Sequence, residues 1–326
     1  TEDGKTTVQI ELDYPAKTQG SVIEEMVRAK LVEAGIPADV KISQNIIAHE
    51  VQRGVKVFDS ARNIIAVSSG KGGVGKSTVS ANLALALQQE GAKVGLLDAD
   101  VYGPSQPTML GITDKPYSVD GKTLEPMVAH GLQVASVGVL IDPDQPMIWR
   151  GPLAVSALQQ LLKQTNWKDL DYLIVDMPPG TGDIQLSLSQ EVPLTGAVVV
   201  TTPQDIALMD ARKGLVMFEK VNVPILGIIE NMATHICSKC GHEEHIFGEG
   251  GAAKMAAQYG VELLGELPLD INIRLSMDKG EPIVISDPDS KVAQAYREIA
   301  RKLAVAVSKK NKDYSAKMPS IKVSDT

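Results

Sequence analysis

The stretch of the sequence best suited to bind a nucleotide is a glycine-rich loop that ends in Lys-Ser. Its residues match the pattern G-x-x-x-x-G-K-[ST] and are Gly70, Lys71, Gly72, Gly73, Val74, Gly75, Lys76 and Ser77. Glycines let backbone N–H groups converge on phosphate oxygens, and the N-terminus of a following helix adds partial positive charge. Lys76 is therefore predicted to contact the β- and γ-phosphates, Ser77 to bind Mg²⁺, and Thr78 to donate to the α-phosphate.

Three aspartates end apolar runs that are predicted to be strands. Asp98 and Asp100 follow the second run, and Asp176 follows the third. The carboxyl ends of parallel strands meet at the crevice where such sheets bind ligands. One such aspartate could be a helix cap, but three of them around a phosphate loop favour a role at the nucleotide.

The sequence contains two cysteines, Cys237 and Cys240, and Gly241 follows them. Two residues between the thiols allow both to bind one metal or cluster, and the glycine permits a tight turn. A cubane iron–sulfur cluster commonly takes four thiolates, and two copies of the chain related by a two-fold axis would supply four. We therefore expect an iron–sulfur site shared between two subunits.

Two other interpretations of the cysteine pair remain open. Three of the five histidines, His235, His242 and His245, lie close to the cysteines. One chain could therefore offer Cys237, Cys240, His242 and His245 as four ligands to zinc. A Cys-x-x-Cys pair can also act as a dithiol redox switch.

Apolar runs without clean alternation, each followed by a helical stretch, predict an α/β fold. The expected architecture is a mostly parallel sheet covered by helices on both faces. The predicted strands span 63–68, 93–98, 172–176, 196–201, 224–229 and 261–267. The predicted helices span 76–90, 151–165 and 204–221, with further helices up to about residue 308.

The two ends of the chain differ from this pattern. Residues 1–55 predict a small α+β segment, with strands near 8–12 and 40–42 and a helix over 21–34. The main domain is expected to span 56–308. Residues 309–326 are polar, Lys-rich and without period, so we expect a disordered tail.

The composition excludes several kinds of partner. The net charge is −8 and the pI is about 5.2, and an acidic balance does not attract nucleic acid or an anionic membrane. No stretch approaches the roughly 18 apolar residues of a membrane span, and no signal pattern opens the sequence. We expect a cytoplasmic protein without a nucleic-acid or membrane partner.

Lys71 gives the loop the form Lys-Gly-Gly-x-Gly-Lys-Ser, which resembles the deviant Walker A subfamily that includes MinD, ParA and dinitrogenase reductase. Three further stretches complete a resemblance to the Mrp/ApbC family over about residues 60–308. They are Asp98-Ala99-Asp100-Val101-Tyr102-Gly103-Pro104-Ser105, Asp176-Met177-Pro178-Pro179-Gly180-Thr181-Gly182-Asp183, and Glu230-Asn231-Met232 with the cysteine pair.

This resemblance implies a role for each matching residue. Lys71 would reach the nucleotide of the partner subunit in a face-to-face dimer. Asp98 and Asp176 would support Mg²⁺ together with Ser77, and Asp100 would orient the attacking water. The Gly180 amide would sense the γ-phosphate. Asn231 would read adenine, with Pro268 in the other wall of the base pocket. Because no Asn-Lys-x-Asp guanine motif is present, ATP is favoured over GTP.

The function implied by the resemblance is a slow ATPase that carries a [4Fe–4S] cluster. The homodimer would bind the cluster at Cys237 and Cys240 and pass it to apo iron–sulfur proteins. Residues 1–43 are similar to the latter part of the MIP18-like domain that often precedes the ATPase. The alternative is a MinD/ParA-like positioning switch with structural zinc at the cysteine pair. Its usual markers are a basic amphipathic C-terminal helix or a basic DNA-binding face, and the low pI disfavours both.

Overall fold

The computed structural model describes residues 6–52, 55–140, 151–237 and 239–313. Within these residues, the largest sheet has eight strands in the order β12-β9-β8-β3-β7-β4-β6-β5. All of its neighbouring strands are parallel except β5 and β6. The strands are β3 (Ala61–Ser69), β4 (Val94–Asp98), β5 (Met127–Ala129), β6 (Leu132–Ser136), β7 (Leu170–Asp176), β8 (Gly196–Thr201), β9 (Ile225–Glu230) and β12 (Leu263–Glu266). This sheet confirms the predicted α/β fold.

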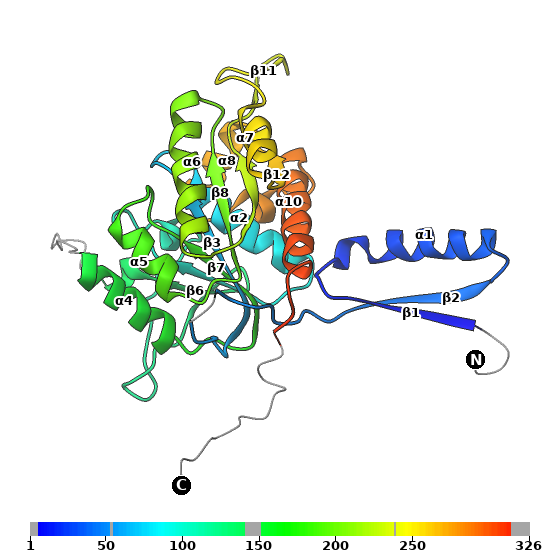
Figure 1. Cartoon of the computed structure of the whole chain (residues 1–326), viewed down its shortest axis with the longest axis horizontal. Coiled ribbons are helices and arrows are strands. Elements are labelled where there is room, and N and C mark those ends of the chain that lie inside the picture. The colour runs from blue at the N-terminus through cyan, green and yellow to red at the C-terminus, as the bar shows by residue number, and fades with distance from the viewer. Residues whose placement is uncertain (1–5, 53–54, 141–150, 238, 314–326) are drawn as a thin grey trace, which may run out of the picture.

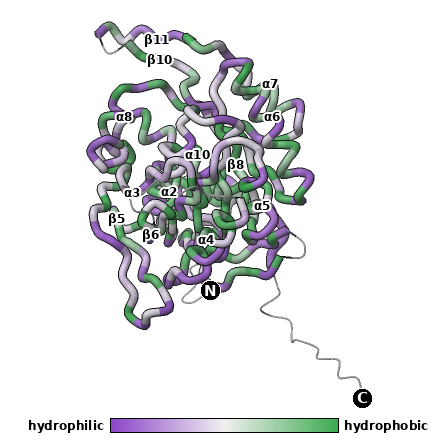
Figure 2. Tube along the Cα trace, turned by 90° about the vertical axis from the view of Figure 1, so that its left-hand side faces the viewer, coloured by the Kyte–Doolittle hydropathy of each residue, from purple (hydrophilic) through white to green (hydrophobic). Residues whose placement is uncertain are grey.

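Helices cover both faces of the sheet. One layer consists of α2 (Lys76–Gln89), α8 (Ile271–Asp278), α9 (Ile283–Ser286) and α10 (Lys291–Ser308), and the other of α4 (Gly151–Gln164), α5 (Asp183–Glu191), α6 (Asp205–Lys220) and α7 (Gly251–Tyr259). In β3, Ile65 and Val67 belong to the first layer's core, whereas Ile64 and Ala66 belong to the second. Because both faces are buried, the strand is a continuous apolar run, and apolar residues concentrate in the interior (Figure 2). In the described residues, no helix is long and apolar enough to cross a membrane.

The structure contains elements that the sequence pattern did not predict. They include β5 and β6 at one edge of the sheet, the short helix α3 (Gln106–Met109), and a hairpin of β10 (His235–Ile236) and β11 (Glu243–Glu244). The β5–β6 turn has positive φ at His130 and Gly131. Each of these elements has five residues or fewer, which is too short for a recognisable period.

The N-terminal residues form a sheet of their own. β1 (Thr6–Leu12) and β2 (Ala38–Gln44) pair in parallel, and α1 (Gly20–Glu33) connects them. This unit projects from the main body (Figure 1). It is attached at Glu90, a fully buried carboxylate at the end of α2. Glu90 accepts a hydrogen bond from the Thr18 N–H at 3.0 Å and pairs with Arg301 at 2.7 Å. Our proposal to divide the chain near residue 55 rests on this separate sheet.

The chain after α10 contacts the segment that links the N-terminal unit to β3. Glu50 N–H donates to the carbonyl of Asn311 at 2.9 Å, and Asp313 N–H donates to the carbonyl of Ala48 at 3.0 Å. The first residues of the expected tail, 309–313, therefore belong to the folded structure. The rest of the expected tail, 314–326, lies outside the described residues.

Candidate nucleotide site and cysteine hairpin

The phosphate loop connects the carboxyl end of β3 to the N-terminus of α2. Gly73 and Gly75 both have a φ of +85°, a conformation that favours glycine. A Cβ atom at Gly72 or Gly73 would meet nothing within 4 Å, so this side of the loop is open. A Cβ atom at Gly70 would overlap the backbone of Asp210, because α6 packs against the other side. The loop is thus supported on one side and open on the other, as phosphate binding requires.

Lys76 is buried at the start of α2 among acidic side chains. Its Nζ atom lies 2.6 Å from Asp176 Oδ1 and 3.4 Å from Asp100 Oδ2, and it donates to Ser77 Oγ at 3.1 Å. A buried ammonium group is tolerated only with such partners. The structure therefore brings together the lysine, the serine and two of the three aspartates predicted from the sequence.

Asp98 completes the acidic cluster, because the β4–β7 register places it directly opposite Asp176. One of its oxygens, Oδ2, accepts hydrogen bonds from the Gln106 N–H at 3.1 Å and the Ser136 hydroxyl at 3.0 Å. Burial and the charge of Asp176 raise the pKa of Asp98 to about 7, and burial likewise raises the pKa of Asp100. A divalent cation would offset this crowded negative charge. The donor set fits the predicted magnesium site.

Two predicted residues lie outside this cluster. Lys71 is half-buried and, in contrast to Lys76, forms no ion pair within the part of the chain that the structure describes. Gly180 has a φ of +93°, and its N–H donates to the carbonyl of Ser69 at 2.9 Å. To contact a γ-phosphate, the Gly180 amide would have to leave Ser69.

The two residues predicted to contact adenine lie on adjoining loops. Asn231 follows β9, and its side-chain amide donates to the carbonyl of Val74 in the phosphate loop at 2.8 Å. Pro268 follows β12, and the carbonyl of the preceding Leu267 accepts from the Ala233 N–H at 2.9 Å. The loops after β9 and β12 are therefore joined, and Asn231 attaches them to the phosphate loop.

The cysteines lie on the tight turn of the β10–β11 hairpin. Cys237 N–H donates to the carbonyl of His242 at 2.9 Å, and Gly241 N–H donates to the carbonyl of Cys237 at 2.8 Å. Gly241 has a φ of +71°, which suits glycine. Backbone N–H groups of Lys239 and Cys240, together with the Cys240 thiol, lower the pKa of Cys237. Both thiols are free, and this turn favours the thiolate that metals and clusters bind.

The nearby histidines are partly engaged elsewhere. Nδ1 of His235 is 3.3 Å from the carbonyl of Leu269, and Nδ1 of His245 is 3.0 Å from the carbonyl of Ala233. His242 is exposed. Around the hairpin, no group of three or more His, Cys, Asp or Glu side chains within residues 6–52, 55–140, 151–237 and 239–313 is arranged to hold a metal ion. The four-ligand zinc set considered from the sequence is therefore not assembled in the described chain.

Three polar residues of the acidic cluster were not predicted from the sequence: Ser80, Gln106 and Ser136. Ser80 Oγ donates to Asp176 Oδ1 at 3.0 Å, and Gln106 Nε2 donates to Asp176 Oδ2 at 2.9 Å. No pattern of residue types marks them as site residues. Pro107 at the start of α3 could have indicated a short helix there, but not that Gln106 is buried.

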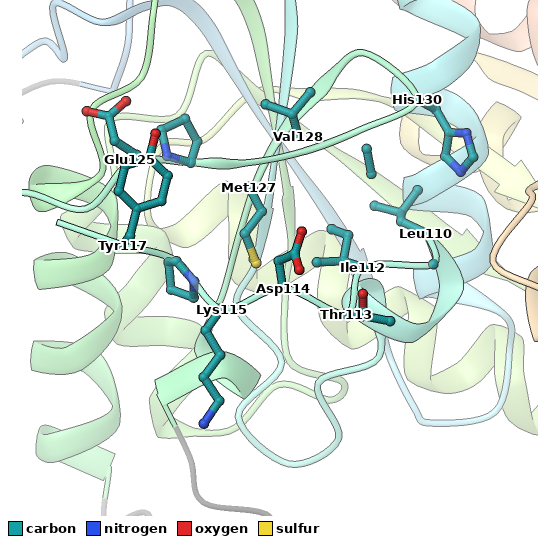
Figure 3. Close-up of a pocket in the computed structure, with 14 residues that line it drawn as sticks. Leu110, Ile112, Thr113, Asp114, Lys115, Tyr117, Glu125, Met127, Val128 and His130 are labelled. Carbon is teal, nitrogen blue, oxygen red and sulfur yellow. The ribbon is translucent and has the colours of Figure 1, made fainter. Parts of the chain in front are cut away.

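A cavity of about 760 Å³ lies beside the edge strand β5 (Figure 3). It is lined by residues 110–117 and 125–130, with the Asp114 carboxylate between the Met127 and Ile112 side chains. None of the residues predicted for the nucleotide or the cysteine site lines this cavity. The candidate nucleotide site lies instead on the loops at the carboxyl ends of the strands.

Comparison with known proteins connects this geometry to a family. A family model described as ParA, NUBPL iron-transfer P-loop NTPase, matches residues 60–304. The iron-sulfur cluster carrier protein of Salmonella typhimurium strain LT2 is 55% identical over 303 residues, which span 91% of this chain and 82% of that protein.

Two solved structures share the fold. The nucleotide-binding protein of Archaeoglobus fulgidus, in complex with ADP, is 37% identical with a TM-score of 0.63, covering 72% of this chain and 92% of that one. The cell-division ATPase MinD of Pyrococcus furiosus is 26% identical with a TM-score of 0.57, covering 74% and 98%.

Proposed function

Since this chain belongs to the ParA-type iron-transfer P-loop NTPases, we propose that it is an ATP-binding iron–sulfur cluster carrier. Its cargo is a [4Fe–4S] cluster, bound at the interface of a homodimer and delivered to apo iron–sulfur proteins. The observation that carries this proposal is the turn with two free thiols, Cys237 and Cys240, in which backbone N–H groups favour the thiolate. Each chain offers two thiolates, and two chains offer the four that a cubane commonly takes.

Exposed apolar side chains support the proposed dimer. On α6, Ile206 and Met209 are 68% and 56% exposed, and Ile236 and Ile246 of the hairpin region are also exposed. Apolar side chains gathered at a surface commonly mark protein interfaces. We expect the second subunit to cover them.

Helix α6 lies against the phosphate loop and against the start of α7, the helix that follows the hairpin. Its Asp210 backbone lies against Gly70 of the phosphate loop, and its Leu208 side chain lies against Gly251, shortly after the hairpin. A subunit that covers α6 would therefore lie next to the phosphate loop. This placement supports a trans role for Lys71, whose ammonium group would reach the partner's nucleotide.

The acidic cluster supports ATP binding with slow hydrolysis. Ser77, Asp98 and Asp176 would hold Mg²⁺, which would screen the charge of the phosphate oxygens. Lys76 would exchange its carboxylate partners for the β- and γ-phosphates, and Asp100, released from Lys76, would orient the attacking water. Because Lys71 would act only across a closed dimer, an isolated chain should turn over slowly.

Anaerobic reconstitution with iron and sulfide tests the carrier function. The product should be a dimer with about four iron atoms per two chains, measured by visible spectrum, metal content and mass. Cys237→Ser and Cys240→Ser should each prevent loading, whereas the control Glu243→Gln, on the exposed strand β11, should load normally. A stable monomer holding one zinc ion would contradict the proposal and support the positioning switch.

A further inference from the structure

Gln106 connects three elements of the nucleotide site. It is the first residue of α3 and is fully buried. Its backbone N–H donates to Asp98 Oδ2 at 3.1 Å. Its side-chain Nε2 donates both to the carbonyl of Ser77 and to Asp176 Oδ2, each at 2.9 Å. One glutamine therefore touches all three residues predicted to hold Mg²⁺.

The other side-chain atom of Gln106, Oε1, is buried and has no hydrogen-bond partner in the described structure. A buried acceptor without a hydrogen-bond partner destabilises the folded state. Such a cost is expected where a site awaits a ligand that brings its own donors. A magnesium ion keeps several of its waters when it binds, and those waters are donors.

We propose that Gln106 is a positioning residue for the magnesium–nucleotide complex. Its backbone N–H holds Asp98 in place, and its side-chain Nε2 holds Asp176. Its Oε1 accepts a hydrogen bond from a water that enters with the ion. This inference rests on the proposed nucleotide function and assigns a residue that the motif pattern does not contain.

The contacts of Asp176 explain why Gln106 matters once nucleotide binds. Asp176 Oδ1 is held by Lys76 and Ser80, while Oδ2 is held by Gln106. When Lys76 turns to the phosphates, Asp176 loses its cation. Gln106 then remains as a neutral donor that fixes the carboxylate without competing for the metal.

The test compares ADP affinity with Mg²⁺ and with EDTA in full-length protein. In Gln106→Met, the gain in affinity that Mg²⁺ provides should fall about tenfold, equivalent to about 1.4 kcal/mol. Affinity in EDTA should change less than twofold. Gln106→Glu keeps the size and adds a third carboxyl beside Asp98 and Asp176; measured at a pH high enough to ionise it, binding in EDTA should weaken and the gain from Mg²⁺ should rise. If Gln106 had a purely structural role, the gain in ADP affinity from Mg²⁺ would not change in opposite directions in the two variants.

Gln52 provides a matched control. It is also buried, its Nε2 donates to the carbonyls of Ser189 and Val192 at 3.0 and 2.6 Å, and its Oε1 also lacks a partner in the described structure. Gln52→Met should lower thermal stability but leave the gain from Mg²⁺ at the wild-type value. If Mg²⁺ increased the ADP affinity of both Gln106 variants as much as it does for wild-type protein, the proposal would be overturned. If wild-type protein bound no ADP, the nucleotide function itself would fail.

Discussion

The two lysines of the phosphate loop have different surroundings. Lys76 is buried against Asp176 and Asp100, whereas Lys71 is half-buried and forms no ion pair within the described residues. The sequence pattern identified both, because glycine spacing and lysine position are local features. It could not identify Gln106, since its burial depends on where strands β4 and β7 end.

Lys76→Ala should abolish nucleotide binding, because it removes the ammonium group predicted to contact the β- and γ-phosphates. It should also destabilise the nucleotide-free protein by about 3 kcal/mol, since Asp176 would be left buried without its cation. Lys71→Ala should bind nucleotide normally and hydrolyse it more slowly. Calorimetric titration with ADP and a phosphate-release assay measure these effects. Equal losses of affinity in both variants would argue against the trans role of Lys71.

The raised pKa of Asp98 predicts a pH effect on stability without metal. Folded Asp98 keeps its proton up to about pH 7, whereas in the unfolded chain it ionises near 3.8. Between pH 3.8 and about 7 the folded state therefore binds a proton that the unfolded state has lost. As the pH rises through this range, the contribution of Asp98 to the free energy of unfolding falls. In EDTA, wild-type protein should lose up to about 4 kcal/mol relative to Asp98→Asn between pH 4 and 7. Urea unfolding at each pH measures the difference, and a constant difference would contradict the prediction.

At the scale of elements, a strand or helix could be predicted only where its hydrophobic sequence pattern is long enough to recognise. The buried strands β3, β7 and β8 are continuous apolar runs, so the central sheet could be predicted. The three-residue strand β5 and the two-residue strands of the cysteine hairpin have no period to detect. Their pairing depends on the turns at Gly131 and Gly241. Likewise, the sequence around Glu90 does not indicate that its carboxylate contacts Thr18 and Arg301, because both residues are distant in the sequence.

The contact between Thr18 and Glu90 predicts how the N-terminal unit is held. Thr18 donates to the Glu90 carboxylate through both its N–H and its hydroxyl, the latter at 2.6 Å. Thr18→Val removes the hydroxyl bond, worth about 1 kcal/mol, so residues 6–44 should exchange amide hydrogens about fivefold faster. The control Thr7→Val, at an exposed position on β1, should exchange at the wild-type rate. Unchanged exchange in Thr18→Val would show that other contacts hold the unit.

At the scale of the whole molecule, the nucleotide and cysteine sites share a loop. Asn231 donates to the phosphate loop, and the same segment continues through His235 into Cys237. The Gly180 N–H donates to the carbonyl of Ser69, so γ-phosphate contact would require the segment that follows β7 to move. We therefore expect nucleotide state to alter how the proposed dimer presents its cysteines.

This coupling is measurable as a difference in affinity. A non-hydrolysable ATP analogue should bind cluster-free and cluster-loaded protein with different affinities, titrated under anaerobic conditions. Linkage requires the nucleotide to change cluster affinity by the same factor, and a tenfold effect would be about 1.4 kcal/mol. Identical affinities would show that the two sites act independently.

The contacts that hold the N-terminal unit also have a consequence for biosynthesis. The charge partner of Glu90 is Arg301, and the linker at Ala48 and Glu50 bonds to Asn311 and Asp313. A ribosome adds about 5–20 residues per second. The nascent chain therefore exposes its first unit for on the order of tens of seconds before those partners are made. During that interval Glu90 lacks the cation that it pairs with in the folded chain, so the complete set of docking contacts forms only after the last helix has been made. A chain released before Arg301 would keep every residue of the phosphate loop and the cysteine turn, yet the Glu90 carboxylate that holds the N-terminal unit would lack its cation.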